Sequence, residues 1–287
     1  MEQISEQVRA LLKGAYDLHL HAAPSPFRRA LDDFELLQEA GEAGMAGIVL
    51  KSHYESTAAR AELVNRHGGF SARAYGGIAL NCPVGGLNPH AVENALKRGA
   101  KIVWMPTRDA QNSLSAGDMP GDFFKREGIS VLDGQGGLRP EVLEILDIVK
   151  GCGAALATGH LSPEESALLC REGTARGVRM VLTHPEFDRT WMDAAAQREL
   201  AERGVYVEKC WYNIAEGNCT AREMARNIRT VGPEHCFLSS DRGQYNREHP
   251  AEGMRLFLAA LLEEGISPEA LYTMTHTVPA QVLGLEN

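Results

Sequence analysis

Short apolar runs recur along this chain, and each is followed by a loop bearing Gly, Pro or Asn and then by an amphipathic stretch. The runs lie about 30 residues apart, which is the length of one strand and one helix with their loops. Continuous runs of Ile, Val, Leu and Ala are typical of parallel strands that are buried on both faces. The sequence therefore predicts eight strands, at residues 15–22, 47–53, 72–80, 101–107, 154–160, 179–184, 205–210 and 236–241.

Helices are expected between these strands, because Pro stands early in several amphipathic stretches, where its missing N–H costs no hydrogen bond. Eight strand–helix units predict an α/β fold, a (β/α)8 TIM barrel with C-terminal capping helices. The chain of 287 residues shows no shift in composition, so residues 1–287 are expected to form a single domain. The expected helices are 1–13, 31–44, 56–67, 89–98, 140–150, 163–173, 191–203, 220–230 and 250–264, with two short ones within 267–285.

One interval breaks the regular spacing of the strands. Residues 107–139 separate the fourth strand from the next long helix, which is too long for a plain connection. Residues 128–133 could add a small strand, and the Gly-rich turn at 134–137 lacks the spacing of a phosphate-binding loop. We therefore expect a long loop after the fourth strand, of the kind that often covers a binding site.

The charge balance and the cysteines limit the partners and the cellular location that can be expected. With 38 acidic and 29 basic residues the net charge is −9, so nucleic acid and an anionic membrane are not expected as main partners. No run approaches the ~20 apolar residues of a membrane span, and the first residues lack the apolar core of a signal peptide. The six irregularly spaced Cys predict reduced thiols. We expect a cytoplasmic protein that binds a small-molecule substrate, with a homo-oligomer left open.

Polar side chains cluster where the expected strands end. Residues alternate faces along a strand, so His19 and His21 point the same way at the end of the first strand. In a parallel barrel the carboxyl ends of all strands converge on one mouth. Five of the ten histidines and one carboxylate stand at such ends: His19, His21, His53, His160, His184 and Asp241.

Imidazole and carboxylate side chains together suit zinc, manganese, iron or nickel. A catalytic site keeps one position open for water and lowers the pKa of that water toward ~7. A carboxylate beside the water can take its proton and return it to a leaving group, and Asp241 is placed for this role. The residues thus predict a divalent metal cofactor, with zinc as the expected ion.

Four motifs occur in order: D-L-H-L-H at 17–21, T-G-H-L at 158–161, L-T-H-P at 182–185 and S-S-D at 239–241. With these motifs, and a tail V-P-A-Q-V-L-G-L similar to the pattern N-P-A-x-x-L-G-L, the chain resembles the amidohydrolase superfamily of metal-dependent hydrolases. The resemblance implies a TIM-like barrel, one or two divalent metals and a hydrolytic water. It also implies that His19, His21, His160, His184 and Asp241 are metal ligands, and that Asp241 doubles as the general acid/base.

The chain departs from that family at the fourth strand, whose end carries a bridging carbamylated Lys or a Glu in two-metal members. Here Lys101 lies at the wrong end of the strand. Lys51 ends the second strand and His53 shares its face, so the two could replace the missing bridge. Apolar surroundings would lower the pKa of Lys51 and permit carbamylation, whereas a charged Lys51 would bind a substrate carboxylate. The Lys-x-His strand suggests a distinct branch of the superfamily.

Further residues near strand ends are candidates for binding the substrate. An Arg fork suits a carboxylate bidentately, a carboxylate can orient a ligating imidazole, and an aromatic ring can wall a pocket. At the end of the seventh strand, alternation lets only one of Glu208 and Lys209 face the mouth, and a salt bridge is their alternative role. The candidates for substrate contacts are Arg108, Arg242, Glu186, Trp211 and Tyr212.

The pattern favours a hydrolase that attacks an amide, cyclic amide, lactone or ester with a metal-activated water. Three alternatives stay open: a decarboxylase or hydratase of the same superfamily, a PHP-type phosphoesterase, and an inactive metal-binding barrel. A PHP-type enzyme would need more His and carboxylate residues between the second and fourth strands than this chain has. Retention of Asp241 together with the histidines argues against an inactive barrel.

Overall fold

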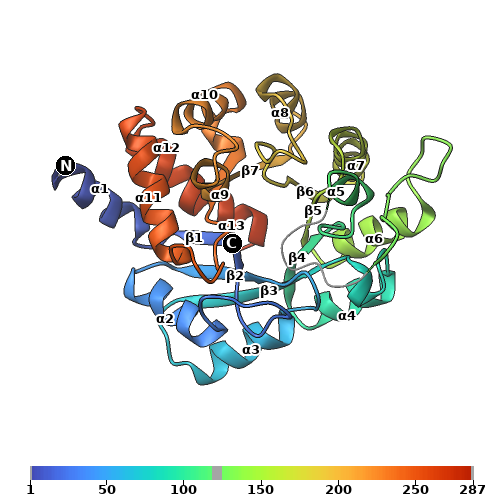
Figure 1. Cartoon of the computed structure of the whole chain (residues 1–287), viewed down its shortest axis with the longest axis horizontal. Helices are drawn as coiled ribbons and strands as arrows, with labels where there is room; N and C mark the ends of the chain where they lie inside the picture. Colours follow the sequence, from blue (N-terminus) through green and yellow to red (C-terminus); the bar gives the residue numbers. More distant parts are fainter. Residues whose placement is uncertain (1, 118–124, 286–287) are drawn as a thin grey trace.

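The computed structural model describes residues 2–117 and 125–285 of the chain. Eight strands form one parallel sheet in sequence order. All eight coincide with the predicted apolar runs, so the predicted strand order is confirmed (Figure 1). The strands are β1 (Tyr16–His21), β2 (Gly47–Lys51), β3 (Arg73–Ala79), β4 (Ala100–Trp104), β5 (Ala155–Ala157), β6 (Arg179–Leu182), β7 (Tyr206–Cys210) and β8 (Cys236–Ser239).

Hydrogen bonds between the chain after β8 and β1 close the sheet into a barrel. The backbone N–H of Asp241 donates to the His19 carbonyl at 2.8 Å, and that of His21 donates to the Arg242 carbonyl at 2.8 Å. Gly243 follows with φ 129°, and a Cβ there would meet the His21 carbonyl oxygen at 1.8 Å, so only glycine fits. The predicted (β/α)8 TIM barrel is confirmed.

Seven of the eight strands end one to three residues earlier than predicted. β5, β6 and β8 stop two or three residues before the polar residues that were expected to close them. Gly159, His184 and Asp241 have φ values of 63°, 26° and 49°, which take the chain out of the extended conformation. The polar residues therefore lie on the first residues of the loops, at the mouth of the barrel.

Helices alternate with the strands and cover the outside of the barrel (Figure 1). The predicted helices are confirmed, with ends that differ by a few residues. The five-residue helices α5 and α9 were not predicted, because one turn is too short to show a periodic pattern. The helices are α1 (Glu2–Leu12), α2 (Asp33–Glu42), α3 (Ala58–His67), α4 (Pro89–Lys97), α5 (Gln111–Ser115), α6 (Pro140–Gly151), α7 (Pro163–Ala175), α8 (Ala194–Ala201), α9 (Trp211–Ala215), α10 (Ala221–Val231), α11 (Pro250–Glu263), α12 (Pro268–Tyr272) and α13 (Val278–Leu283).

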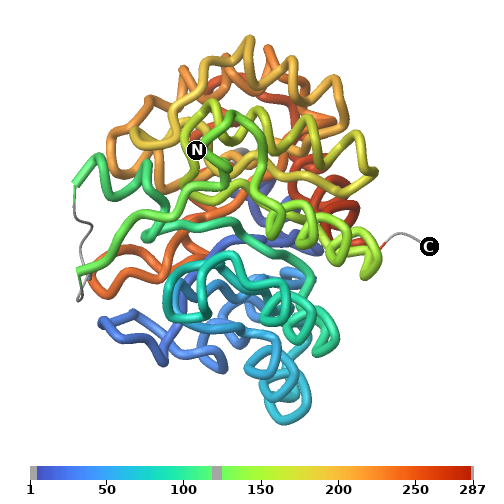
Figure 2. The backbone as a smooth tube through the Cα atoms, turned by 90° about the vertical axis from the view of Figure 1, so that its right-hand side faces the viewer, coloured from blue at the N-terminus to red at the C-terminus, as the bar shows by residue number. Residues whose placement is uncertain are grey.

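The tail differs from the prediction of two separate short helices, because a π-helical turn, η3 (Thr273–Thr277), joins α12 to α13. Leu283 and Val282 of α13 pack against the side chains inside the barrel, including Leu18 and Phe237. Figure 2 shows the red C-terminal segment beside the blue first strand. The tail thus caps the inner core at the barrel end opposite to the mouth.

The long connection after β4 contains α5 but no named strand in its described part. Residues 128–133, expected as a small strand, form only single bridges, between Ala110 and Ile129 and between Leu132 and Leu138. Isolated bridges leave most backbone groups outside a ladder, so this segment is a loop. Residues 118–124 of the predicted long loop lie outside the described residues. Within the described ranges, no helix has the length and apolarity that crossing a membrane requires.

A partly buried ion pair ties the start of α2, and the loop before it, to α3. Arg60 donates from Nε and Nη2 to the two carboxylate oxygens of Asp33, each at 2.7 Å, and from Nη2 to the Ala23 carbonyl at 2.9 Å. Removing one partner of a buried pair leaves an uncompensated charge. We expect Arg60→Met to lower the free energy of unfolding by ~3 kcal/mol, measured by chemical denaturation.

The exposed pair Arg66–Glu62 on the same helix gives a matched control. Surface pairs contribute little, so Arg66→Met is expected to leave the free energy of unfolding nearly unchanged. Equal destabilisation by Arg60→Met and Arg66→Met would contradict a special role for the buried pair.

Candidate active site

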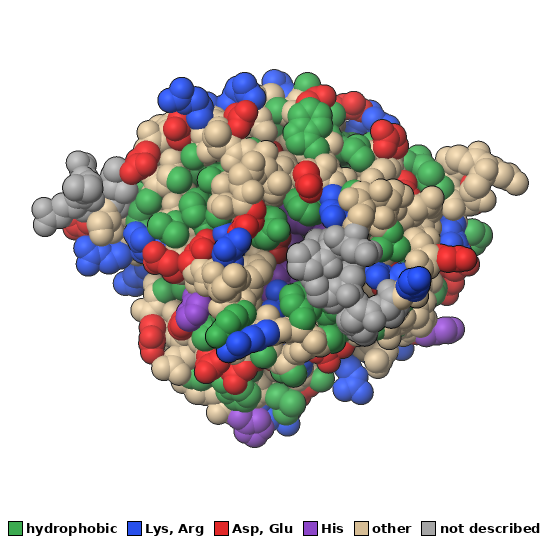
Figure 3. Space-filling view, in the orientation of Figure 1, with side chains coloured by type: hydrophobic (Ala, Val, Ile, Leu, Met, Phe, Trp, Pro, Cys, Tyr) green, Lys and Arg blue, Asp and Glu red, His purple; other side chains and the backbone are tan. Residues whose placement is uncertain are grey.

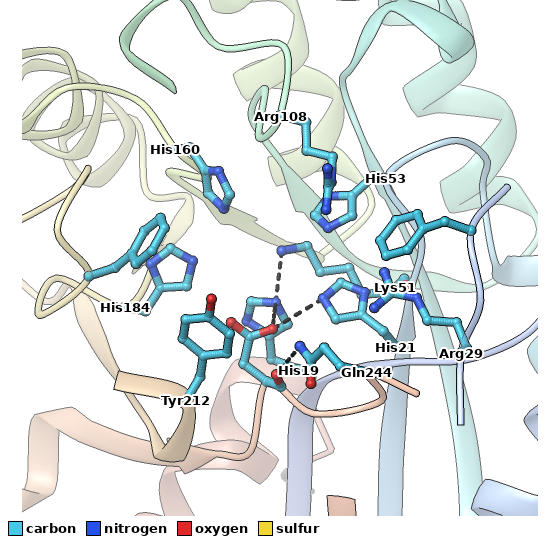
Figure 4. Close-up of a pocket in the computed structure, with 13 residues that line it drawn as sticks. His19, His21, Arg29, Lys51, His53, Arg108, His160, His184, Tyr212 and Gln244 are labelled. Atoms are coloured by element: carbon cyan, nitrogen blue, oxygen red, sulfur yellow. Dashed lines mark hydrogen bonds and ion pairs between the residues drawn. The ribbon is translucent and has the colours of Figure 1, made fainter. Parts of the chain in front are cut away.

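A cavity of about 130 Å³ opens at the carboxyl ends of the strands. Figure 3 shows histidine side chains at the bottom of the hollow, and Figure 4 shows the side chains around it. All seven residues predicted as metal ligands line this cavity, so the fold brings them together. The lining residues are His19, His21, Phe27, Arg29, Lys51, His53, Arg108, His160, His184, Phe187, Tyr212, Asp241 and Gln244.

His19 and His21 lie on one face of β1, with their ring centroids 5.4 Å apart. The Nδ1 of His19 donates to Glu208 Oε1 at 2.9 Å, and the Nδ1 of His21 donates to the carbonyl of Lys51 at 3.1 Å. These partners fix the orientation of each ring from the side that faces away from the cavity. The Nε2 atoms of both rings are therefore left to face the cavity (Figure 4).

The other three histidines extend the group across the mouth. The ring centroid of His184 lies 5.7 Å from that of His19 and 5.1 Å from that of His160. The ring centroid of His53 lies 4.8 Å from that of His21. Five imidazoles from four different strand ends thus surround one small space (Figure 4).

Two of these rings are also fixed through Nδ1. The Nδ1 of His53 lies 2.8 Å from Thr107 Oγ1, and the Nδ1 of His184 lies 3.3 Å from Thr190 Oγ1. His160 differs, because its buried Nδ1 has no hydrogen-bond partner among the described residues. A buried polar atom without a partner is costly unless a ligand satisfies it.

Burial keeps four of these imidazoles neutral at physiological pH, those of His21, His53, His160 and His184. It lowers the pKa of His21, His53 and His160 well below the usual value, and nearby positive charges lower it further. Burial also lowers the pKa of His184 to about 4, although Glu208 attracts the proton. A neutral imidazole keeps a lone pair, which is the form that binds a metal ion.

Asp241 follows β8 and carries the carboxylate of the cavity. Its Oδ1 lies 3.2 Å from the Nε2 of His19 and 3.1 Å from the Nε2 of His21. Its Oδ2 forms no hydrogen bond with any residue that the structure describes. Burial alone would raise the pKa of Asp241, but His19 and His21 outweigh it and hold the pKa well below its usual range. Asp241 is therefore ionised, with one oxygen available.

Lys51 ends β2 and is buried at the centre of the group. Its Nζ lies 2.8 Å from the Nε2 of His19 and 5.2 Å from the ring centroid of Trp104. Burial lowers the pKa of Lys51, against the attraction of Asp241 and Glu208. A lysine in such surroundings carries a larger neutral fraction than one in water.

Glu208 on β7 is a site residue that the sequence left undecided. It faces His19, while its neighbour Lys209 points to the other side of the strand and pairs with Glu186 at 2.5 Å. Of the two residues only Glu208 thus faces the mouth, and the alternative role in a salt bridge applies to Lys209, whose partner is Glu186. Oε2 of Glu208 also accepts the backbone N–H of His184 at 3.1 Å, so one carboxylate positions two histidines.

Cys210 belongs to the same face of β7 and was not predicted as a site residue. Its Sγ lies within 4.8 Å of ligand atoms of His19 and Asp241. Burial raises the pKa of Cys210 well above its usual value, and Glu208 raises it further. The thiol is therefore protonated, and it is a weaker candidate ligand than the imidazoles.

Two predicted substrate-binding residues after β7 and β8 do not line the cavity. Arg242 is buried and donates to Glu216 at 2.9 Å and to Glu248 at 2.8 Å. Trp211 donates its Nε1–H to the same Glu248. The physical reason is ion pairing: Glu216 and Glu248 hold the guanidinium of Arg242 outside the cavity lining. Tyr212 lines the cavity, as predicted.

Glu186 is also placed elsewhere than predicted. It was a candidate for orienting a ligating imidazole, but it accepts from Lys209 Nζ and from Gln197 Nε2 at 3.2 Å. This buried ion pair lies behind β7, outside the cavity lining. Arg108, by contrast, lines the cavity at the position predicted for a substrate contact.

Sequence reasoning missed several lining residues, namely Phe27, Arg29, Phe187 and Gln244. Phe187 follows the His184 motif closely, and its aromatic ring was a signal that could have been used. Arg29 and Gln244 lie on two loops that form an antiparallel bridge with each other. Nothing in the local sequence indicates that pairing, because it joins loops that are far apart in the chain.

Replacing Glu208 with glutamine tests its positioning role. Gln keeps the size of Glu208 but removes the charge that favours the Nδ1–H tautomer of His19, and outer partners of ligating histidines typically contribute 10–100-fold in metal affinity. We expect Glu208→Gln to weaken zinc binding by roughly that factor, measured by competition with a chromogenic chelator. Exposed Glu199 supplies the control: a loss of the same size in Glu199→Gln would contradict a local effect.

Several solved structures have folds similar to that of this barrel. Similar solved structures are an amidohydrolase from Pseudomonas aeruginosa (13% identity, TM-score 0.66, 98% of both chains covered) and the probable dipeptidase PvdM from the same organism (11%, 0.64, 99% and 98%). An organophosphorus hydrolase from Deinococcus radiodurans is also similar (15%, 0.59, 94% and 92%). At these identities the likeness shows a shared fold.

No curated protein matches the sequence. A family model matches residues 14–208, more than half of the chain, so the protein belongs to the family of unknown function DUF6282.

Proposed function

We propose that this protein is a metal-dependent hydrolase of the amidohydrolase type, which cleaves an amide, cyclic amide, lactone or ester. The observation that carries the proposal is the arrangement of the imidazoles. Four of five cavity histidines have Nδ1 at a protein partner, which leaves Nε2 for the cavity, beside the ionised Asp241. The barrels that share this fold and bear hydrolase names support the proposal at the level of architecture.

The donor atoms fit a divalent metal ion. Two ligands at about 2.1 Å from one ion and 90–110° apart lie roughly 3.0–3.4 Å from each other. Asp241 Oδ1 lies 3.2 Å and 3.1 Å from the Nε2 atoms of His19 and His21, within this range. The partnerless Nδ1 of His160 and the neutral state of its imidazole agree with ligation. Nitrogen and carboxylate donors favour zinc, with manganese, iron and nickel as alternatives.

In this proposal His19, His21, His160, His184 and Asp241 hold the metal. When bound, a divalent ion supplies Lewis acidity, which lowers the pKa of water and polarises a carbonyl group. Asp241 accepts the proton of the attacking water on Oδ2, the oxygen without a hydrogen bond, and returns it to the leaving group. Phe187 and Tyr212 form an aromatic wall that limits access of bulk water. The free state of all six cysteines supports a cytoplasmic location.

Lys51 and His53 line the same cavity as the five proposed metal ligands and complete the proposed site. A neutral Lys51 amine can add to CO2, forming a carbamate and releasing a proton, and the carbamate oxygens would then serve as ligands. We expect metal-stripped protein to regain activity with zinc faster in the presence of bicarbonate, and 13C-bicarbonate to give a carbamate signal in NMR spectra. The signal should be absent from Lys51→Met. Reconstitution indifferent to bicarbonate, with no signal, would leave Lys51 as a cation.

Turnover assays on metal-analysed protein test the function itself. We expect bound metal after gentle purification, and hydrolysis of lactone, ester or amide probes that stops on chelation and returns with zinc. Hydrolysis of p-nitrophenyl phosphate alone would favour a phosphoesterase instead. Absence of bound metal, together with no affinity on titration, would refute every metal-dependent function considered.

A further inference from the structure

Two arginines converge on one aromatic ring at the rim of the cavity. The guanidinium carbon of Arg29 lies 4.4 Å from the ring centroid of Phe27, and that of Arg108 lies 4.8 Å from the same centroid. Arg29 comes from the loop after β1 and Arg108 from the loop after β4. Both line the cavity, and Figure 4 shows them on the side of His53 and His21.

Arg29 is buried and has no ion-pair partner among the described residues. Its residue is only 9% exposed, its Nε has no hydrogen-bond partner, and it forms no ion pair within 4.0 Å among the described residues. Burial, and after it the charge of Arg108, lowers the pKa of Arg29 to about 10, although Asp241 and Tyr54 act in the opposite direction, so the guanidinium stays charged at neutral pH. A buried charge without a partner is unfavourable unless a ligand provides one.

The structure holds Arg29 in place rather than leaving it on a mobile loop. Its backbone forms a bridge with Gln244, and the N–H of Ala30 donates to the Gly243 carbonyl at 3.0 Å. Arg60 fixes the start of the same loop through the carbonyls of Ala23 and Pro24. The fold thus orders this cation before any ligand binds, so that binding loses less conformational entropy. Such ordering is what preorganises a recognition site.

The charge of the cavity is opposite to that of the whole protein. Its lining contains two guanidinium groups, those of Arg29 and Arg108, against one carboxylate among the described residues, that of Asp241, whereas the chain has a net charge of −9. A cavity that concentrates positive charge in an acidic protein attracts an anionic small molecule.

From these observations we propose that Arg29 and Arg108, stacked on Phe27, form a carboxylate-binding subsite, so that the substrate is a carboxylate-bearing amide, lactone or ester. A planar guanidinium matches the two oxygens of a carboxylate, and the flat ring of Phe27 keeps both forks oriented. The subsite lies beside His53 and His21, so the bound carboxylate would place the scissile carbonyl toward Asp241. That the carboxylate belongs to a substrate rests on the proposed hydrolase function.

Binding of benzoate and of its neutral counterpart benzamide tests the subsite without any turnover. We expect calorimetry on the chelator-treated protein to detect benzoate, and Arg29→Met to weaken benzoate binding at least 10-fold while any benzamide binding is unchanged. Arg29→Lys should recover part of the affinity, because it restores the charge but lacks the fork. Since no metal is present, failure of the hydrolase proposal would leave this result intact.

The adjacent Arg28 gives the matched control. Arg28 is exposed, and its guanidinium lies 3.1 Å from the ring centroid of Tyr245, outside the cavity lining. We expect Arg28→Met to bind benzoate as the unmodified protein does. Equal benzoate affinity in Arg29→Met and the unmodified protein would overturn the proposal, as would equal losses in Arg28→Met and Arg29→Met. Tighter Arg29-dependent binding of inorganic phosphate than of benzoate would overturn the carboxylate assignment. Thermal unfolding curves establish that each variant is folded.

Discussion

Replacing Asp241 with asparagine is expected to lower kcat by ~10²–10⁴-fold, because the variant has no carboxylate to move a proton between water and leaving group. Asn keeps the size of Asp241 and an oxygen near the Nε2 atoms of His19 and His21, so the fold and most of the metal affinity should remain. Steady-state kinetics on protein of known metal content would measure the effect.

The control for this prediction is Asp188, an exposed carboxylate close enough to Tyr212 to influence its pKa. Asp188→Asn removes the same charge from the mouth without touching the group around His19. We expect its kcat to stay within a factor of about two of the unmodified protein, since surface changes of this kind have small effects. Unchanged turnover in Asp241→Asn would remove Asp241 from the mechanism.

Replacing His19 with alanine is expected to have the second large effect, on metal binding. His19 contacts Asp241, Lys51 and Glu208, so its imidazole connects the carboxylate, the amine and the outer carboxylate of the site. Loss of a ligand should cost more than the ~10–100-fold that outer partners contribute, so zinc affinity should fall by more than ~100-fold. Because a ligand stabilises the folded state it binds, zinc should raise the Tm of the unmodified protein far more than that of His19→Ala.

His90 provides a histidine of similar chemistry outside the site. It lies exposed at the start of α4 and does not line the cavity. His90→Ala is expected to retain both the zinc affinity and the zinc-dependent rise in Tm. If His19→Ala binds zinc as tightly as His90→Ala does, His19 is not a ligand and the metal assignment fails.

The metal-ligand candidates could be predicted because each stands at the end of a recognisable strand. Buried parallel strands read as apolar runs, and their carboxyl ends must meet at one mouth. His19 and Asp241 are more than two hundred residues apart, yet this rule alone places them together. The structure adds the backbone hydrogen bond between them, at 2.8 Å, which also closes the barrel.

The substrate-binding residues were predicted less well, because their role depends on the direction in which loop side chains point. Arg242 and Arg29 are both cations near the mouth, and the sequence favoured Arg242 because it follows a strand end. In the structure Arg242 pairs with Glu216 and Glu248, while Arg29 lines the cavity and forms no ion pair among the described residues. The distinction depends on glutamates that come from other elements, which no local pattern reveals.

The sequence by itself determined the barrel, the order of its strands and the five histidines and aspartate at its mouth, because apolar periodicity and strand-end position are local properties. Only the tertiary structure decided that Glu208 holds His19, that Lys209 and Glu186 pair away from the site, and that Arg29 and Arg108 share the ring of Phe27. These are contacts between residues distant in the chain, and they are fixed by barrel closure and by loop pairing.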